Sequence, residues 1–199
     1  LWNVTLGYGR RELVDAAAKQ MSELAYASGY AGSTNLRALE LGELLASCVY
    51  PHIHRFFFTS GGGESTDSTI KTARCYWKAL GRPGKYKTIS LLGGYHGVTL
   101  AAMCATGMPA YWPAFEPRMP GFVHIPNHDR YRYVVPPGAD PATAAADELE
   151  RAILAEGPES VALFIVEPVM GGGAYVPPAG YFQRIRAICD QYDVLFAAD

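Results

Sequence analysis

Three polar residues and one glycine-rich segment each follow an apolar run of the chain. The polar residues are Tyr95, Glu167 and Asp199, and the segment is Ser-Gly-Gly-Gly at residues 60–63. A glycine-rich turn before a helix lets backbone N–H groups and the helix dipole meet an anion, so a phosphate is the natural ligand. An ordinary glycine turn ahead of a capped helix explains the same segment equally well.

The residues around this turn narrow the kind of phosphate site. No Gly-Lys-Ser/Thr follows, so the segment is not a Walker loop, and its spacing is not GxGxxG, which argues against a nucleotide-binding Rossmann domain. Glu64 and Asp67 belong to the first turn of the expected helix. Both carboxylates must therefore point away from a phosphate bound there.

The three polar residues suit a planar ring that carries charge. Tyr95 can lie flat on such a ring, although a core tyrosine is the simpler interpretation of this residue alone. Asp199 closes an apolar run, where a carboxylate needs a partner: a protonated pyridine nitrogen is one, and the start of a following helix is another. Glu167 either orients the site or binds backbone at its own turn.

The remaining histidines and cysteines do not indicate a metal. We interpret His96, which is adjacent to Tyr95, as structural. His52 and His54 are suitably spaced for a metal pair, but no carboxylate or cysteine completes it, so we expect no metal site. No CxxC pair occurs among the cysteines, which argues against a disulfide framework and favours a cytoplasmic location; they are Cys48, Cys75, Cys104 and Cys189.

Apolar spacing predicts alternating helices and strands. Steps of three and four predict helices at residues 11–27 and 36–49. Further helices are expected at residues 64–80, 98–105, 144–156 and 180–191. Short apolar runs predict strands at residues 55–59, 86–92, 161–166 and 194–198. Residues 106–142 are rich in proline and aromatic residues and show no clear period, so we expect an ordered loop with a binding or interface role.

This alternation indicates an α/β fold with a mostly parallel sheet covered by helices on both faces, because the expected strands are apolar on both sides. We divide the chain into an N-terminal helical segment, residues 1–50, and part of a large domain, residues 51–199. Ligands of such sheets bind beyond the carboxyl ends of the strands. All four segments that could do chemistry follow an expected strand.

The composition argues against two classes of partner. The formal net charge of the 199 residues is −2, with both signs mixed along the chain, and 49% of the residues are hydrophobic. A nucleic-acid-binding protein would show a basic stripe, which is absent from the sequence. No apolar run approaches the roughly 20 residues of a membrane-spanning helix, so we expect no membrane partner.

Taken in order, the motifs resemble those of class III aminotransferases, and specifically the omega-transaminases. They are Phe-Phe-Thr-Ser-Gly-Gly-Gly-Glu-Ser-Thr-Asp at residues 57–67, Gly-Tyr-His-Gly at 94–97, Val-Glu-Pro-Val-Met-Gly-Gly-Gly at 166–173, and the final Ala-Ala-Asp. The resemblance begins at Leu-Trp-Asn-Val, residues 1–4, and covers the whole sequence. Each motif alone is unspecific, whereas their order and spacing together are specific.

The resemblance implies a fold-type I enzyme that uses pyridoxal 5'-phosphate (PLP) and forms a homodimer with its active site near the subunit interface. Gly62 and Gly63 would hold the cofactor phosphate through backbone N–H groups. Tyr95 would stack on the ring, and Asp199 would pair with the ring nitrogen.

The resemblance also assigns residues around these contacts. His96 and Glu167 join the cofactor-binding set. Trp2 and Tyr30 match aromatic residues that wall the substrate pocket of relatives, although each is also compatible with a core or interface position.

The implied reaction moves an amino group from an amine to a keto acid such as pyruvate through a Schiff base with PLP. Many relatives have serine at the position of Gly63, so here only backbone can serve the phosphate. Ornithine- and GABA-type relatives have glutamate at the position of Gly172, paired with a carboxylate-reading arginine. Its absence favours amines, diamines, β-amino acids or taurine as donors.

The reaction needs a lysine to hold the cofactor and move a proton. None of the five lysines is expected near the strand ends; they are Lys19, Lys71, Lys78, Lys85 and Lys87. In relatives the lysine follows the aspartate by a few dozen residues. We therefore interpret the sequence as an N-terminal portion and expect it to be inactive alone, while the full-length protein is active.

The same residues are compatible with two other kinds of function. An aminomutase, racemase or decarboxylase would share the same phosphate, ring and nitrogen contacts. A non-catalytic partner subunit that binds PLP would lack the lysine altogether.

Overall fold

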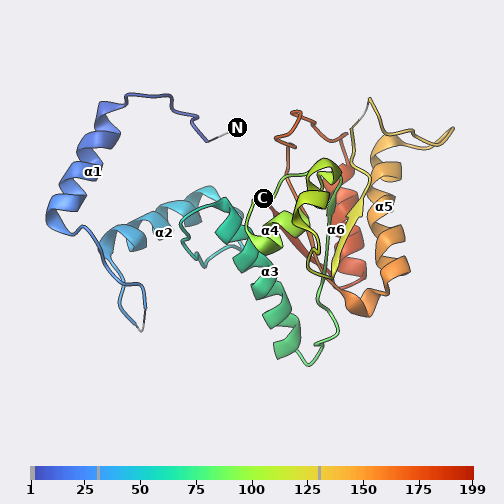
Figure 1. Cartoon of the computed structure of the whole chain (residues 1–199), viewed down its shortest axis with the longest axis horizontal. Coiled ribbons are helices and arrows are strands. Elements are labelled where there is room, and N and C mark those ends of the chain that lie inside the picture. The colour runs from blue at the N-terminus through green and yellow to red at the C-terminus, as the bar shows by residue number, and fades with distance from the viewer. Residues whose placement is uncertain (1–2, 31, 130) are drawn as a thin grey trace. The chain divides into compact units, whose positions relative to one another are not determined.

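The computed structural model describes residues 3–30, 32–129 and 131–199, and Trp2 therefore lies outside the described residues. It divides into two compact units, Leu1–Phe58 and Thr59–Asp199 (Figure 1). The division falls eight residues after the boundary placed between residues 50 and 51 from the sequence.

The first unit contains two helices, α1 (Arg11–Glu23) and α2 (Leu36–Cys48). Helix α2 begins at a cap in which the Asn35 side chain accepts a hydrogen bond from the Ala38 N–H at 2.9 Å. No residue of either helix is buried. Both helices were expected, and α1 ends four residues earlier than its apolar pattern suggested.

Residues 55–59 do not form the strand that their aromatic run predicted. Phe57 and Phe58 are exposed, and no strand pairing involves this segment within the described residues. A strand exists only through hydrogen bonds to a neighbouring chain segment, so a high intrinsic preference of phenylalanine for strands does not suffice without that neighbour.

The second unit is built on four parallel strands, which confirms the predicted α/β fold. In chain order they are β1 (Lys87–Leu91), β2 (Phe122–Ile125), β3 (Val161–Val166) and β4 (Leu195–Ala198), and their spatial order is β2-β1-β3-β4. Each neighbouring pair is parallel. The carboxyl ends of the strands therefore meet at one edge of the sheet.

Helices cover both faces of this sheet. They are α3 (Gly62–Ala79), α4 (Leu100–Ala105), α5 (Pro141–Glu156) and α6 (Tyr181–Gln191), with short 3₁₀ helices η1 (Pro109–Phe115) and η2 (Pro158–Ser160) (Figure 1). On β3, Phe164 and Val166 pack in the core cluster that contains α5 and α6, while Leu163 and Ile165 pack in the cluster that contains α3. The alternation of strand side chains thus fills two separate cores.

Strand β2 corrects the prediction of one long loop over residues 106–142. It has only four residues, lies between Pro120 and Pro126, and occupies the edge of the sheet beside β1. Proline is compatible with the ends of an edge strand. Because the strand between the two prolines has only four residues, the apolar run was too short to indicate a strand.

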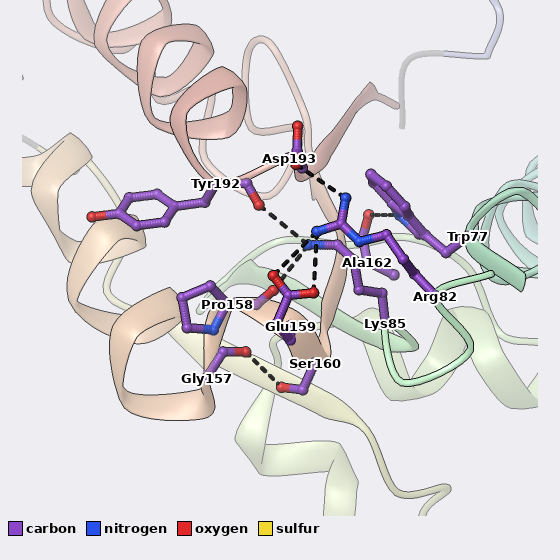
Figure 2. A network of polar contacts seen from close by, with 10 residues as sticks. All are labelled: Trp77, Arg82, Lys85, Gly157, Pro158, Glu159, Ser160, Ala162, Tyr192 and Asp193. Atoms are coloured by element: carbon purple, nitrogen blue, oxygen red, sulfur yellow. Dashed lines mark hydrogen bonds and ion pairs between the residues drawn. The ribbon is translucent and has the colours of Figure 1, made fainter. Parts of the chain in front are cut away.

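Two of the five lysines lie where β1 begins, at the end of the sheet opposite to Tyr95. Lys85 is buried, and its ammonium donates to the carbonyl oxygens of Pro158, at 2.9 Å, and of Tyr192, at 3.2 Å (Figure 2). It also lies over the Trp77 ring, 4.8 Å from the centroid. Trp77 in turn donates from Nε1 to the carbonyl oxygen of Ala162 at 2.9 Å.

Arg82 completes this network on the outside. Its guanidinium pairs with Asp193 at 3.0 Å and with Glu159 at 3.2 Å, and the Arg82 side chain is 31% exposed (Figure 2). The network joins α3, the chain before β3 and the chain before β4, and thereby fixes the amino ends of the strands relative to one another.

We expect Lys85→Met to destabilise the protein by about 1–3 kcal/mol, because it removes the buried ammonium that binds two carbonyl oxygens while keeping the length of the side chain. The free energy of unfolding in urea measures this effect. Arg82→Met is the matched control and should cost less, since its partners remain accessible to water. Equal losses in the two variants would contradict a structural role for the buried ammonium.

Candidate functional site

Three neighbouring strands deliver the predicted polar residues to one edge. Residues 93–97 follow β1, Glu167 follows β3 and Asp199 follows β4. The Asp199 N–H still donates to the carbonyl oxygen of Val166 at 3.0 Å, so the parallel ladder continues to this residue. We call residues 93–97, 167 and 199 the strand-end rim.

Asp199 is held by His96. Asp199 Oδ2 lies 2.7 Å from His96 Nδ1, and the histidine side chain is 1% exposed against 30% for the aspartate. Because a carboxylate only accepts, this contact requires the proton on Nδ1. Asp199 Oδ1 has no hydrogen bond within the described residues. One oxygen is therefore fixed and the other is available to a cationic group.

His96 is itself fixed by a residue that the motifs did not reveal. Its backbone N–H donates to the Thr106 hydroxyl at 3.0 Å. That hydroxyl has two acceptors within reach of its one proton, the carbonyl oxygens of Ala102 at 3.0 Å and of Gly97 at 3.1 Å. Thr106 is buried at the end of α4. The histidine thus holds Asp199 from its buried side.

Glu167 clamps two turns together. Its Oε2 accepts from the backbone N–H of Tyr95 at 3.0 Å, and its Oε1 accepts from that of Gly171 at 2.9 Å. The sequence left two roles open for Glu167, orienting the site or binding backbone at its own turn. The carboxylate does both, because it binds the backbone of its own turn and that of Tyr95. The Tyr95 ring is 48% exposed, which corrects the alternative of a core tyrosine.

The glycine segment begins helix α3 at Gly62. The N–H groups of a first helical turn have no acceptor within their own helix, so those of Gly62 and Gly63 can serve an anion. The carbonyl oxygen of Gly63 accepts from the Thr99 hydroxyl at 3.1 Å, which fastens this turn to the start of α4. No sequence signal had pointed to Thr99.

The two acidic residues of this turn are occupied by other backbone groups. Glu64 accepts from the Ser60 N–H at 2.8 Å, and Asp67 accepts from the Ala102 N–H at 2.8 Å. The hydrogen bond from Ser60 holds the pKa of Glu64 below its ordinary value. Asp67 therefore ties α3 to α4, and Glu64 folds back on the chain that precedes the helix.

Gly97 lets the strand-end rim meet the glycine segment. Its φ is +119°, and a Cβ atom built there would lie 2.7 Å from the Gly63 Cα and 3.0 Å from the Ala102 Cβ. The backbones at Gly97 and Gly63 are so close that a side chain at residue 97 would clash with residue 63. Tyr95, Asp199 and the start of α3 are thereby brought into one site.

Tyr30, predicted for the substrate pocket, belongs to the first unit, where the residue is 84% exposed. In the part of the chain that the structure describes, no three histidine, cysteine or acidic residues gather to hold a metal. No described helix is long and apolar enough to cross a membrane.

Comparisons with known proteins identify the family of this chain. The family model described as aminotransferase class III matches residues 1–199. A probable aminotransferase of Mycobacterium tuberculosis is 44% identical, a mitochondrial gamma aminobutyrate transaminase of Solanum lycopersicum 40%, and a putrescine–pyruvate aminotransferase of Pseudomonas aeruginosa 38%. Each match covers 100% of this chain and 43%, 39% and 44% of the relative, respectively.

A solved structure agrees with these relatives. The omega-transaminase of Pseudomonas jessenii in complex with PMP superposes with a TM-score of 0.92 at 38% identity, over 100% of this chain and 45% of that one. The chain belongs to the class III aminotransferase family. It spans less than half the length of the relatives it matches.

We expect Gly97→Ala to lower the stability of the protein by about 1–3 kcal/mol more than Gly138→Ala does, because only the first adds a clash to the backbone strain. Gly138 is the matched control: its φ is +78°, and a Cβ atom there meets nothing within 4 Å. Thermal unfolding of the two variants measures the difference. Equal shifts would show that the crossing of Gly97 and Gly63 tolerates a side chain.

Proposed function

We propose that the full-length protein is a PLP-dependent aminotransferase and that this chain supplies most of the cofactor cradle. The observation that carries the proposal is the carboxylate of Asp199, which His96 fixes through one oxygen while the other stays available. A protonated pyridine nitrogen is a cation that fits a half-occupied carboxylate at a sheet edge. The resemblance of the motifs and the family support the same assignment.

The other residues of the site fit the remaining parts of PLP. Gly62 and Gly63 would bind the phosphate at the start of α3, since their N–H groups lack helical acceptors. Tyr95 would cover one face of the ring, in an orientation that Glu167 fixes through the backbone. When bound, PLP supplies a cationic ring that withdraws electrons from the carbon carrying the amino group.

The residues of this chain contribute to the chemistry by fixing the position of the Asp199 carboxylate. His96 keeps the Asp199 carboxylate oriented toward the ring position, and Thr106 keeps His96 in place. An ionised Asp199 favours the protonated ring nitrogen by direct charge pairing. Such fixed groups stabilise charge without having to reorganise during the reaction.

We also propose that the proton-transferring lysine lies outside this sequence. Lys85 and Lys87 lie at the opposite end of β1, and Lys85 is bound to two carbonyl groups there. Lys71 and Lys78 lie further along α3 than its first turn, and Lys19 belongs to α1 in the other unit. The four lysines of the second unit are therefore not members of the strand-end rim.

For the donor we propose an amine, diamine, β-amino acid or taurine, with pyruvate as acceptor. Gly172 supports this choice, because ornithine- and GABA-type relatives have glutamate at this position, where it pairs with a carboxylate-reading arginine. A relative named for putrescine and pyruvate fits the proposal, whereas the relatives named for GABA make the donor the point to test.

A cytoplasmic homodimer is our proposal for the assembled protein. The first unit supports it through exposed apolar side chains on both helices, among them Val14, Met21, Leu39 and Leu44. The described cysteines are all free thiols, as suits a reducing compartment. Light scattering of the full-length protein would give twice the chain mass, and a monomer would contradict the proposal.

The reaction is tested with the full-length protein and PLP. We expect the visible absorption of bound cofactor to change on addition of putrescine and to return with pyruvate, with alanine formed, and GABA to be a poor donor. The 199-residue chain should form no alanine. Alanine formed by that chain alone would contradict a lysine outside it, and absence of any visible band would contradict the cofactor assignment.

Conversion of the amine without formation of alanine would indicate one of the other PLP reactions. A band that no amine changes would indicate a binding subunit without catalysis. Either result would replace the proposed reaction while leaving the family unchanged.

We expect Asp199→Asn to lower kcat by about 100-fold or more, because it removes the charge that stabilises a protonated ring nitrogen but keeps the side-chain size. Asp193→Asn is the matched control: this aspartate lies at the other end of β4 and pairs with Arg82. Its activity should stay near that of the wild type. Retention of activity in Asp199→Asn would remove Asp199 from the chemistry.

A further inference from the structure

His128 carries polar atoms that the cofactor site does not use. It follows β2, its side chain is 2% exposed, and neither ring nitrogen has a hydrogen-bond partner within the described residues. The great majority of buried polar groups in proteins are hydrogen-bonded. Packing accounts for part of this ring, since it meets the Tyr181 ring edge-on with centroids 4.9 Å apart, but not for its two nitrogens.

A cavity of about 90 Å³ adjoins His128. Three segments line it: the chain after β2, the start of α5 and the chain before α6, through His128, Tyr133, Val135, Pro141, Ala145 and Pro178. The Tyr133 hydroxyl is already engaged with the Ala144 carbonyl oxygen at 2.8 Å and with Glu148 at 3.1 Å. Among the side chains that line the cavity, His128 therefore offers two ring nitrogens without a hydrogen-bond partner in the described residues.

The surroundings of His128 favour an uncharged ligand. Burial lowers the pKa of His128, so the ring is neutral and presents one donor and one acceptor. The adjacent Asp129 is occupied, because it accepts from the Tyr131 N–H at 3.0 Å and from Arg132 at 2.9 Å. Neither an anion nor a cation would find an opposite charge on these walls.

The size of the cavity sets the scale of the ligand. One water needs about 10–15 Å³ of such volume, so the cavity exceeds a single water several-fold. The other lining side chains are apolar, which suits a ligand with a short hydrocarbon part. A short amide or alcohol combines such a part with both hydrogen-bonding functions.

We propose that this cavity, the His128 pocket, is a binding site for a small uncharged molecule that both donates and accepts hydrogen bonds. Water fills it in the resting protein, and a short amide or alcohol displaces that water. The proposal rests on the chain's own packing and is independent of the transamination proposed above.

The His128 pocket is also connected to the strand-end rim. Arg132 Nη1 donates both to Asp129 and, at 2.9 Å, to the Tyr175 hydroxyl. Tyr175 pairs with Met170 across the glycine turn whose Gly171 N–H binds Glu167. A ligand in the pocket would therefore stiffen a segment that braces this turn.

The test uses the full-length protein and acetamide, with acetone as a probe of similar shape that only accepts hydrogen bonds. We expect nitrogen-15 NMR of histidine to show a saturable change at His128 with acetamide and a response to acetone at least tenfold weaker. A crystal structure should show water within hydrogen-bond distance of a His128 nitrogen, replaced by acetamide after soaking.

Two variants separate the pocket from general effects. His128→Leu removes the polar partner, and Ala145→Val fills part of the cavity but keeps the histidine; acetamide binding should weaken at least tenfold in both. If His128→Leu does not fold, Ala145→Val still decides the question. Equal binding by Ala145→Val, an empty cavity in the wild type, a protein side chain filling it, or binding only at soaking concentrations would each overturn the proposal.

Discussion

Parallel pairing of β1, β3 and β4 is the constraint on which the rest of the second unit depends. Because the three strands run in one direction, the residues that follow each of them reach the same edge, although β1 and β4 are separated by about half the chain. The buried network around Lys85 fixes the opposite ends of the same strands. The amino ends of the strands are thus held by the Lys85 network, and the carboxyl ends carry the residues of the site.

The side chains that the sheet edge brings together are oriented by other residues packed against them. Asp199 would be a poorly directed carboxylate without His96, and His96 depends on Thr106 for its own position. Glu167 acts in the same way on Tyr95, through the peptide N–H rather than through the ring. A common pattern emerges in which buried or backbone-bound residues orient the exposed ones that would meet a ligand.

The sequence allowed prediction of the parallel sheet and its covering helices, because apolar runs that are buried on both faces alternate with helical segments along the chain. It did not allow prediction of β2, whose four residues lie between prolines, nor of the missing strand at residues 55–59, whose outcome depends on a neighbouring segment. At the site, Tyr95, Glu167 and Asp199 were visible from their positions after strands. Thr99 and Thr106 were not, since a threonine that accepts or donates one hydrogen bond has no sequence signature.

We propose that the strand-end rim and the start of α3 bind the two ends of one PLP molecule. The most direct measurement is a crystal structure of the full-length protein grown with PLP. It should place the ring nitrogen within hydrogen-bond distance of Asp199 Oδ1 and the phosphate against the N–H groups of Gly62 and Gly63. A cofactor bound elsewhere, or one whose ring nitrogen faces away from Asp199, would contradict the account.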